Sequence, residues 1–194
     1  MAGLGDIALK DLRRFIVSPT GAKHRVFAWM EIGVILDHLL KFFARDDDDF
    51  FGVLHSRAHE VWSLRTGTSL EDRPRYTPTT CFETLPLPWP PGTEPGEEDG
   101  RVRAVAAAAR EQDRLRRGYL DPPGADAATL KTRTLTNLYN ARPTWLAHAH
   151  AALDRAVWGA YGWDDADPGA TAEETILARL LGLNGERCGA LKSP

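Results

Sequence analysis

Two charged residues that could read a base pair lie in a polar stretch near the middle of the chain. Glu71 and Arg73 are two positions apart, so they would project from the same side if 64–75 were extended. A carboxylate can accept a hydrogen bond from N4 of cytosine, and a guanidinium can donate to O6 and N7 of guanine. Together they could read one C·G pair. Such a pair is more often a surface ion pair worth about 0–1 kcal/mol, and the residues alone favour that interpretation.

Histidines and aspartates raise the question of a metal site. His55 and His59 are spaced to place two imidazoles on one face of a helix, but zinc needs a third ligand and no Glu follows the first His as in zinc proteases. The run 46–49 consists of four aspartates, and adjacent carboxylates cannot all face one ion. We therefore predict no metal site, and expect the aspartates to precede a helix, where their charge is favourable.

The sequence contains no recognisable catalytic or cofactor-binding motif. There is no Gly-x-Ser-x-Gly nucleophile motif and no glycine-rich phosphate loop. The tetrapeptide 121–124, Asp-Pro-Pro-Gly, is similar to the Asp/Asn-Pro-Pro-aromatic motif of methyltransferases that act on a flipped base. Gly124 replaces the aromatic residue that would stack on that base. We therefore predict no catalytic residue in this chain, and whether it acts within an enzyme stays open at this point.

Composition indicates a globular protein. The 194 residues are 43% hydrophobic and 26% charged, with a net charge of −3. No apolar run approaches the ~20 residues that span a bilayer, and the first residues have no basic region followed by an apolar core. Cys81 and Cys188 cannot form a disulfide framework or a zinc site by themselves. We expect a cytoplasmic protein with no membrane partner.

The elements that would position these residues differ between the two halves of the chain. Alternation predicts short strands, and helical periodicity predicts one amphipathic helix over 50–64. The Pro- and Gly-rich run 86–100 predicts a semi-rigid linker, and the remainder is helical. The expected fold class is α+β. The predicted strands are 12–17, 24–30 and 39–44, and the predicted later helices are 101–119, 130–139, 144–161 and 171–183.

Three long stretches resemble a known family. They are 18–27, 43–86 and 134–146, the last followed by similar pieces at 153–157 and 160–163. Together they are similar to the C-terminal part of MmeI-like DNA methyltransferases. These are class I S-adenosylmethionine-dependent adenine methyltransferases of single-chain restriction–modification and phage-defence systems.

The resemblance implies a division of the chain and a function. It implies a small mixed strand–helix target recognition domain at 1–90, a Pro/Gly-rich linker at 91–100 and an all-helical C-terminal domain at 101–194. The methyltransferase core of the family lies upstream and binds S-adenosylmethionine, so no cofactor is expected in this chain. The implied function is sequence recognition of DNA in a site-specific adenine-N6 methyltransferase, without catalysis by this chain alone. The implied partners are double-stranded DNA and a methyltransferase core, in cis or as a separate chain.

The resemblance also assigns candidate DNA-contacting residues. The charged pair after the Gly-x-x-Leu turn reads one base pair in the family, and these positions are Glu71 and Arg73 here. Other candidates contact the DNA backbone or support the loop: Arg75, Tyr76, Lys23, His24 and Arg25. For 23–25 a purely structural strand is an equally good interpretation. Two alternatives for the whole chain are a protein–protein docking module that uses 98–194, and a non-functional fragment of such an enzyme.

Overall fold

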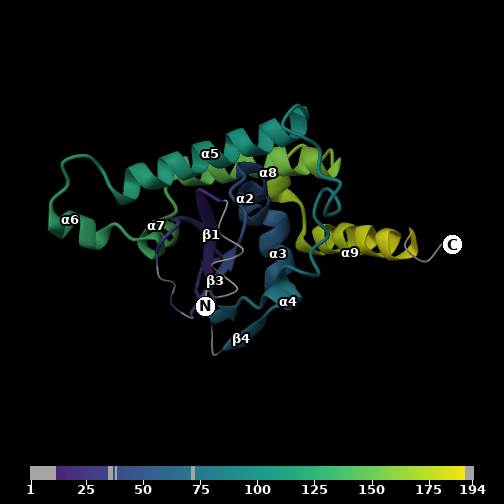
Figure 1. Ribbon diagram of the computed structural model, residues 1–194, viewed down its shortest axis with the longest axis horizontal. Helices are drawn as coiled ribbons and strands as arrows, with labels where there is room; N and C mark the ends of the chain where they lie inside the picture. Colours follow the sequence, from purple (N-terminus) through teal and green to yellow (C-terminus); the bar gives the residue numbers. More distant parts are fainter. Residues whose placement is uncertain (1–11, 35–36, 38, 71–72, 191–194) are drawn as a thin grey trace.

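The protein has an α+β fold, as predicted, in a computed structural model that describes residues 12–34, 37, 39–70 and 73–190. A three-stranded antiparallel sheet has the order β2-β1-β3, and a separate two-stranded hairpin is formed by β4 and β5. Helices cover the sheet, and Figure 1 shows α5 and α8 running side by side across the top of the molecule, above α2. None of the helices in the described part of the chain is long and apolar enough to cross a membrane.

The three-stranded sheet forms close to the predicted strands. It consists of β1 (Arg14–Pro19), β2 (Ala28–Glu31) and β3 (Leu40–Phe43). The prediction of a strand over 24–30 is wrong in its first half, because the pairing of β1 with β2 ends at Ala28. Before that point side chains replace the strand partner: the Ser18 hydroxyl donates to the Val26 carbonyl, and Arg116 donates to the Phe27 carbonyl. Residues 20–27 therefore form a loop.

The predicted helix over 50–64 is two helices, α2 (Asp48–His55) and α3 (Arg57–Thr66). Ser56 separates them with extended backbone angles, φ −72° and ψ 155°. Its hydroxyl oxygen accepts from the His59 N–H and so caps α3. Periodicity could not reveal this break, since the apolar pattern continues through it.

A hairpin follows α3 directly. Its strands are β4 (Thr68–Leu70) and β5 (Arg73–Arg75), and α4 (Pro78–Cys81) comes next. Gly67 separates α3 from β4, and a Cβ atom at this position would lie 2.6 Å from the Ser63 carbonyl oxygen and 2.9 Å from that of Arg75. The close approach of the hairpin to the end of α3 therefore requires glycine.

The second half is helical. One helix was predicted near 130–139, but Arg133 and Thr134 separate two, because the Thr134 hydroxyl oxygen accepts from the Asn137 N–H and caps a new helix. The last helix extends beyond its predicted end at 183. The bounds are α5 (Gly100–Leu120), α6 (Ala127–Thr132), α7 (Leu135–Ala141), α8 (Thr144–Tyr161), a 3-10 turn (Pro168–Ala170) and α9 (Glu173–Ala190).

Both halves contribute to one hydrophobic core. Buried side chains of the sheet and α2 pack with buried side chains of α5 and α8. Gly52 lets α2 approach both helices, since a Cβ there would lie 2.7 Å from Val105 Cγ1 and 3.1 Å from Leu153 Cδ1. Representative core residues are Ile16, Phe27, Phe51, Val105, Ala109 and Leu153. The domain boundary predicted at 91–100 stays a prediction.

Candidate nucleic-acid interface

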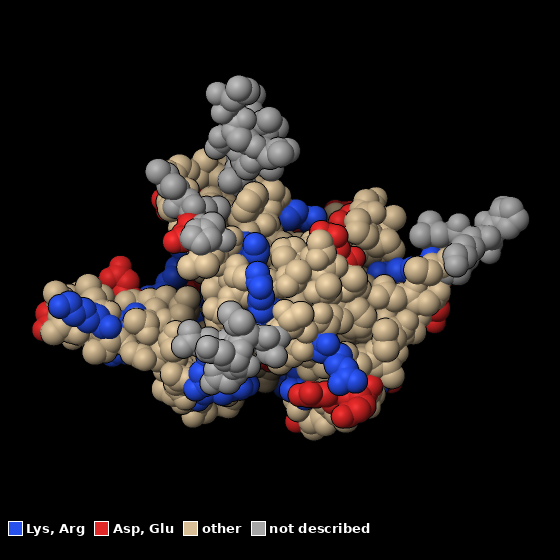
Figure 2. Space-filling view, turned by 90° about the horizontal axis from the view of Figure 1, so that it is seen from below, with Lys and Arg blue, Asp and Glu red and all other residues tan. Residues whose placement is uncertain are grey.

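The structure brings the loop 20–27 and the hairpin together. The Tyr76 N–H donates to the Thr20 carbonyl at 2.7 Å, and Gly21 forms a β-bridge with Arg75. Arg75 is exposed. Figure 2 views the molecule from the side on which β4 lies in Figure 1, and Lys and Arg side chains lie on this face in several separate patches, one of them beside Asp and Glu side chains. Two segments some fifty residues apart in sequence thus form one surface.

The predicted base-reading pair cannot be placed as a pair. Glu71 lies outside the described residues. The backbone of Arg73 pairs with that of Leu70 across the hairpin. The premise of one extended segment over 64–75 is wrong, because the chain is helical to Thr66 and then folds into two antiparallel strands. The base-reading roles of Glu71 and Arg73 stay predictions.

Tyr76 lies in the interior. Its hydroxyl donates to His59 Nε2 at 3.1 Å, while His59 Nδ1 donates to the Leu54 carbonyl at 2.8 Å. Burial lowers the pKa of His59 to about 4 and raises that of Tyr76. The Tyr76 ring also contacts Phe27 edge to face. Tyr76 therefore supports the loop and the hairpin from beneath.

Arg25 is also buried. Its guanidinium lies over the Tyr76 ring, 4.7 Å from the ring centroid, and the residue is 8% exposed. Its three guanidinium nitrogens have no hydrogen-bond partner among the described residues. Burial lowers the pKa of Arg25, partly offset by nearby Cys81, Tyr76 and Glu60. Arg25 thus supports the loop from inside the protein by packing on Tyr76, while its guanidinium N–H groups donate no hydrogen bond to a described residue.

Lys23 and His24 contact the helical half. Lys23 Nζ donates to Asn140 Oδ1 at 2.7 Å, and His24 Nε2 lies 2.9 Å from the same oxygen. The His24 ring also lies beside that of Tyr139. Sequence reasoning missed Asn140 and Tyr139, although both belong to the stretch 134–146. Their place beside the loop depends on how α7 packs, which no local pattern reveals.

A buried arginine joins the loop to α5. Arg116 is 2% exposed, donates to the Phe27 carbonyl at 3.0 Å and pairs with Asp113 at 3.1 Å. His150, on α8, accepts from Gln112 at 2.9 Å, and burial together with the charge of Arg116 lowers its pKa to about 4. These contacts hold loop, sheet and helices in a single arrangement.

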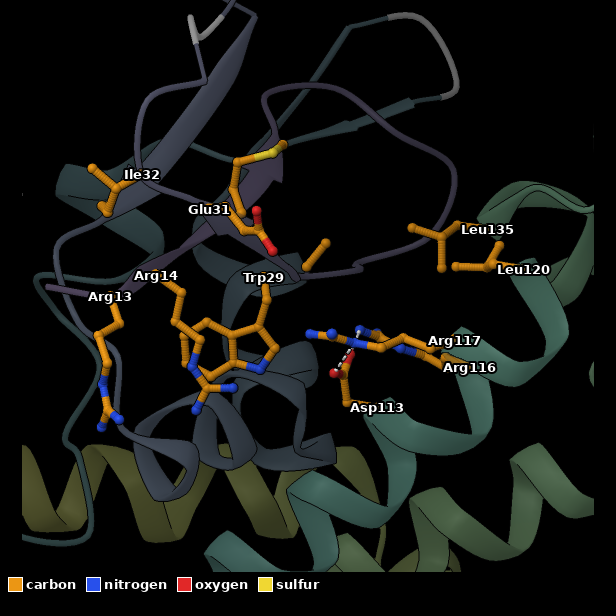
Figure 3. A pocket seen from close by; sticks show the side chains of 12 residues that line it. Arg13, Arg14, Trp29, Glu31, Ile32, Asp113, Arg116, Arg117, Leu120 and Leu135 are labelled. Atoms are coloured by element: carbon orange, nitrogen blue, oxygen red, sulfur yellow. Dashed lines mark hydrogen bonds and ion pairs between the residues drawn. The ribbon is translucent and has the colours of Figure 1, made fainter. Parts of the chain in front are cut away.

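A hollow of about 530 Å³ lies between the sheet and the C-terminal end of α5. Figure 3 shows arginines on both sides of it, with Trp29 between them. Arg14 lies over Trp29, 3.7 Å from the ring centroid, and pairs with Asp48 at 2.7 Å. On the other side Asp113 pairs with Arg116 and Arg117. Ion pairs engage three of these arginines, with Asp113 shared between two of them, and we take the hairpin surface, which carries the predicted and exposed Arg75, as the candidate interface.

The residues considered for metal binding have other partners. His55 and His59 lie on different helices, so the expectation that they share one helical face is wrong. In the aspartate run, Asp47 pairs with Arg45, and Asp48 also receives a contact from Arg110. Within the described ranges no group of three or more potential ligands converges.

The fold and the site define a mixed strand–helix module in which a short hairpin joins the loop 20–27. No sequence profile of a known protein family matches the chain, and no curated protein matches it. Among solved structures, the chain is similar to the Type IIL restriction-modification enzyme MmeI in complex with DNA. The TM-score is 0.70 and the sequence identity 21%, over 92% of this chain and 22% of that one. The two share a fold, and this chain spans about a fifth of that enzyme's length.

Proposed function

We propose that this chain is the DNA sequence-recognition portion of a site-specific adenine-N6 methyltransferase of a restriction–modification system, without catalytic activity by itself. The observation that carries the proposal is the shared fold over 92% of the chain with part of a restriction-modification enzyme solved with DNA. The three stretches that resemble this family support it from the sequence.

The hairpin is the element best suited to contact DNA. The major groove admits a two-stranded β-ribbon, and β4–β5 is such a ribbon, with Arg75 exposed on it and Lys23 exposed on the adjoining loop. In this proposal Glu71 and Arg73 read a C·G pair, Arg75 and Lys23 contact the backbone, and Tyr76 supports the hairpin.

The chain requires a second component for methylation. The methyltransferase core, which would supply the S-adenosylmethionine site, lies in cis or on a partner chain. With a net charge of −3, the chain alone gains little from neutralising phosphates, so we expect its own DNA binding to be weak and to depend only slightly on salt concentration.

The first prediction concerns the base-reading pair. Glu71→Lys removes the acceptor for cytosine N4, so the preferred base pair should change while affinity for the new site stays within about tenfold of the original. The measurement is selection from a randomised duplex library at fixed salt. Glu186→Lys, the same charge change on the exposed end of α9, serves as control and should keep the original preference. An equal loss of affinity for every sequence would contradict the base-reading role.

Capture of interacting proteins tests the second component. Affinity purification from the source cell should recover a methyltransferase core, and the mixture should methylate DNA when S-adenosylmethionine is added. A preparation that binds no DNA and recovers no such core would contradict the proposal and favour the docking or fragment alternatives.

A further inference from the structure

Asn140, near the C-terminal end of α7, joins the loop 20–27 to the helical half of the chain. Its side-chain oxygen Oδ1 lies 2.7 Å from Lys23 Nζ and 2.9 Å from His24 Nε2. An ammonium group donates hydrogen bonds and accepts none, so the atom that faces Lys23 is the amide oxygen and not the amide nitrogen. His24 Nε2 therefore also donates to this oxygen. The two contacts hold the amide group in one orientation.

The hydrogen-bonding groups left over at this point are all donors. The amide nitrogen of Asn140 carries two N–H groups, and Lys23 Nζ carries three, of which the amide oxygen accepts one. Both residues are exposed, and neither nitrogen has a further partner among the described residues. Free donors beside a positive charge favour a negatively charged acceptor.

The charge of Lys23 has no counter-charge among the described residues. Arg142 and Glu60 carry opposite charges and line a small cavity of about 80 Å³ behind the loop. Asp154, a further carboxylate near Arg142, is buried and accepts from a backbone N–H of α3. Neither carboxylate forms an ion pair with Lys23. An anion that contacts Asn140 from outside can therefore pair with Lys23.

The contact between Asn140 and Lys23 continues the surface proposed for DNA. Gly21 forms a β-bridge with Arg75 of the hairpin. Lys23 follows Gly21 by two residues, which is at most about 7 Å of extended chain. Arg75, Lys23 and Asn140 therefore follow one another from the hairpin, across the loop, to α7.

We propose that Asn140 is a DNA-contacting residue of the helical half, which orients Lys23 through its oxygen and donates from its nitrogen to the same backbone phosphate. This inference rests on the proposed recognition of DNA and extends the interface from the hairpin to α7. Phosphate oxygens accept hydrogen bonds from Lys and Asn side chains, and such contacts fix the register of a protein on the duplex without reading bases. In this way the helical half sets how the hairpin approaches the DNA.

Asn140→Asp tests the inference, because a phosphate contact and a purely structural contact predict different results. The new carboxylate still accepts from Lys23 and His24, so the contact between the loop and α7 is kept. It removes both amide N–H groups and neutralises Lys23. Duplex binding should therefore weaken about tenfold, equally for all sequences. The measurement is a fluorescence-anisotropy titration of the full chain with labelled duplexes at one low salt concentration.

Asn184→Asp is the matched control. It makes the same change on α9, at the other end of the molecule from α7 (Figure 1), and should bind DNA like the wild type. Wild-type binding by Asn140→Asp as well would overturn the inference and leave Asn140 as a contact that only holds the loop. A changed preferred sequence in Asn140→Asp would assign the position to base reading and would also overturn it.

These two results leave the proposed function intact. A wild-type chain that binds no DNA, alone or with a methyltransferase core, would instead overturn the proposed function together with this inference.

Inorganic phosphate separates a DNA phosphate from a free ion. The donors are exposed, so a free ion would keep most of its contacts with water. Replacing chloride by phosphate at the same pH and ionic strength should therefore not raise the Tm of the full chain. A saturable rise in Tm that disappears in Asn140→Asp would identify a free-ion site and overturn the assignment to DNA.

Discussion

At the residue scale, Asp154 links two helices through one carboxylate. Its Oδ1 accepts from the Arg57 N–H at 2.7 Å, so a side chain of α8 caps the first turn of α3. Burial raises the pKa of Asp154 from 3.8 to about 6. Since the folded state holds this proton more tightly than the unfolded state, the group stabilises the fold fully below about pH 4, and this contribution is lost as the pH rises through about 6.

Asp154→Asn tests this linkage. The amide oxygen can still accept from Arg57, but no charge is buried, so the free energy of unfolding at pH 8 should rise by about 1–2 kcal/mol. Urea denaturation from pH 4 to pH 8 should also show a smaller decline in stability than in the wild type. Asp164→Asn, at an exposed position, is the control. Parallel pH profiles for Asp154→Asn and the wild type would contradict the assignment.

At the element scale, the hairpin β4–β5 depends on Gly67. A methyl group there would meet backbone oxygens of Ser63 and Arg75, which cannot move aside as a side chain could. Gly67→Ala should lower the free energy of unfolding by about 1–3 kcal/mol and weaken DNA binding by displacing the hairpin. Chemical denaturation and a DNA-binding titration measure the two effects.

Gly118→Ala provides the matched control for this substitution. Gly118 lies on α5 with nothing within 4 Å of its would-be Cβ, so the same change should stabilise the protein by about 0.5–1 kcal/mol. Equal effects of the two substitutions would show that the contacts at Gly67 do not hold the hairpin in place.

At the scale of the whole molecule, the two halves depend on a common core. Side chains of the sheet and α2 pack against α5 and α8, and Arg116 bonds to the Phe27 carbonyl across the same boundary. We therefore expect 1–90 and 101–194, produced separately, to lack cooperative unfolding, and co-expression to restore it. Thermal unfolding followed by circular dichroism, together with the spread of amide chemical shifts in NMR spectra, measures whether each half is folded and unfolds cooperatively. Cooperative unfolding of 101–194 alone would instead establish 91–100 as a boundary between independent domains.

Sequence patterns predicted the fold class and most elements, and these successes share a cause. The sheet strands and the helices over 101–119 and 144–161 lie within a residue or two of their predicted positions, apart from the shortened second strand. Such periodicity and turn residues act over a few neighbours, so they can be read along the chain. Where one hydroxyl caps the start of a new helix, at Ser56 and Thr134, periodicity did not show the break between the two helices.

The sequence by itself determined that the chain is an α+β protein whose predicted strands lie in its first half and whose second half is helical, and its residues carry the resemblance to a family of restriction–modification enzymes. Only the tertiary structure decided that Tyr76 and Arg25 are buried, that Asn140 holds Lys23 and His24, and that a polar cavity lies behind the loop. The physical reason is that these features arise from contacts between segments far apart in the chain. Burial and cavities are properties of the packed elements together, and no local pattern encodes them.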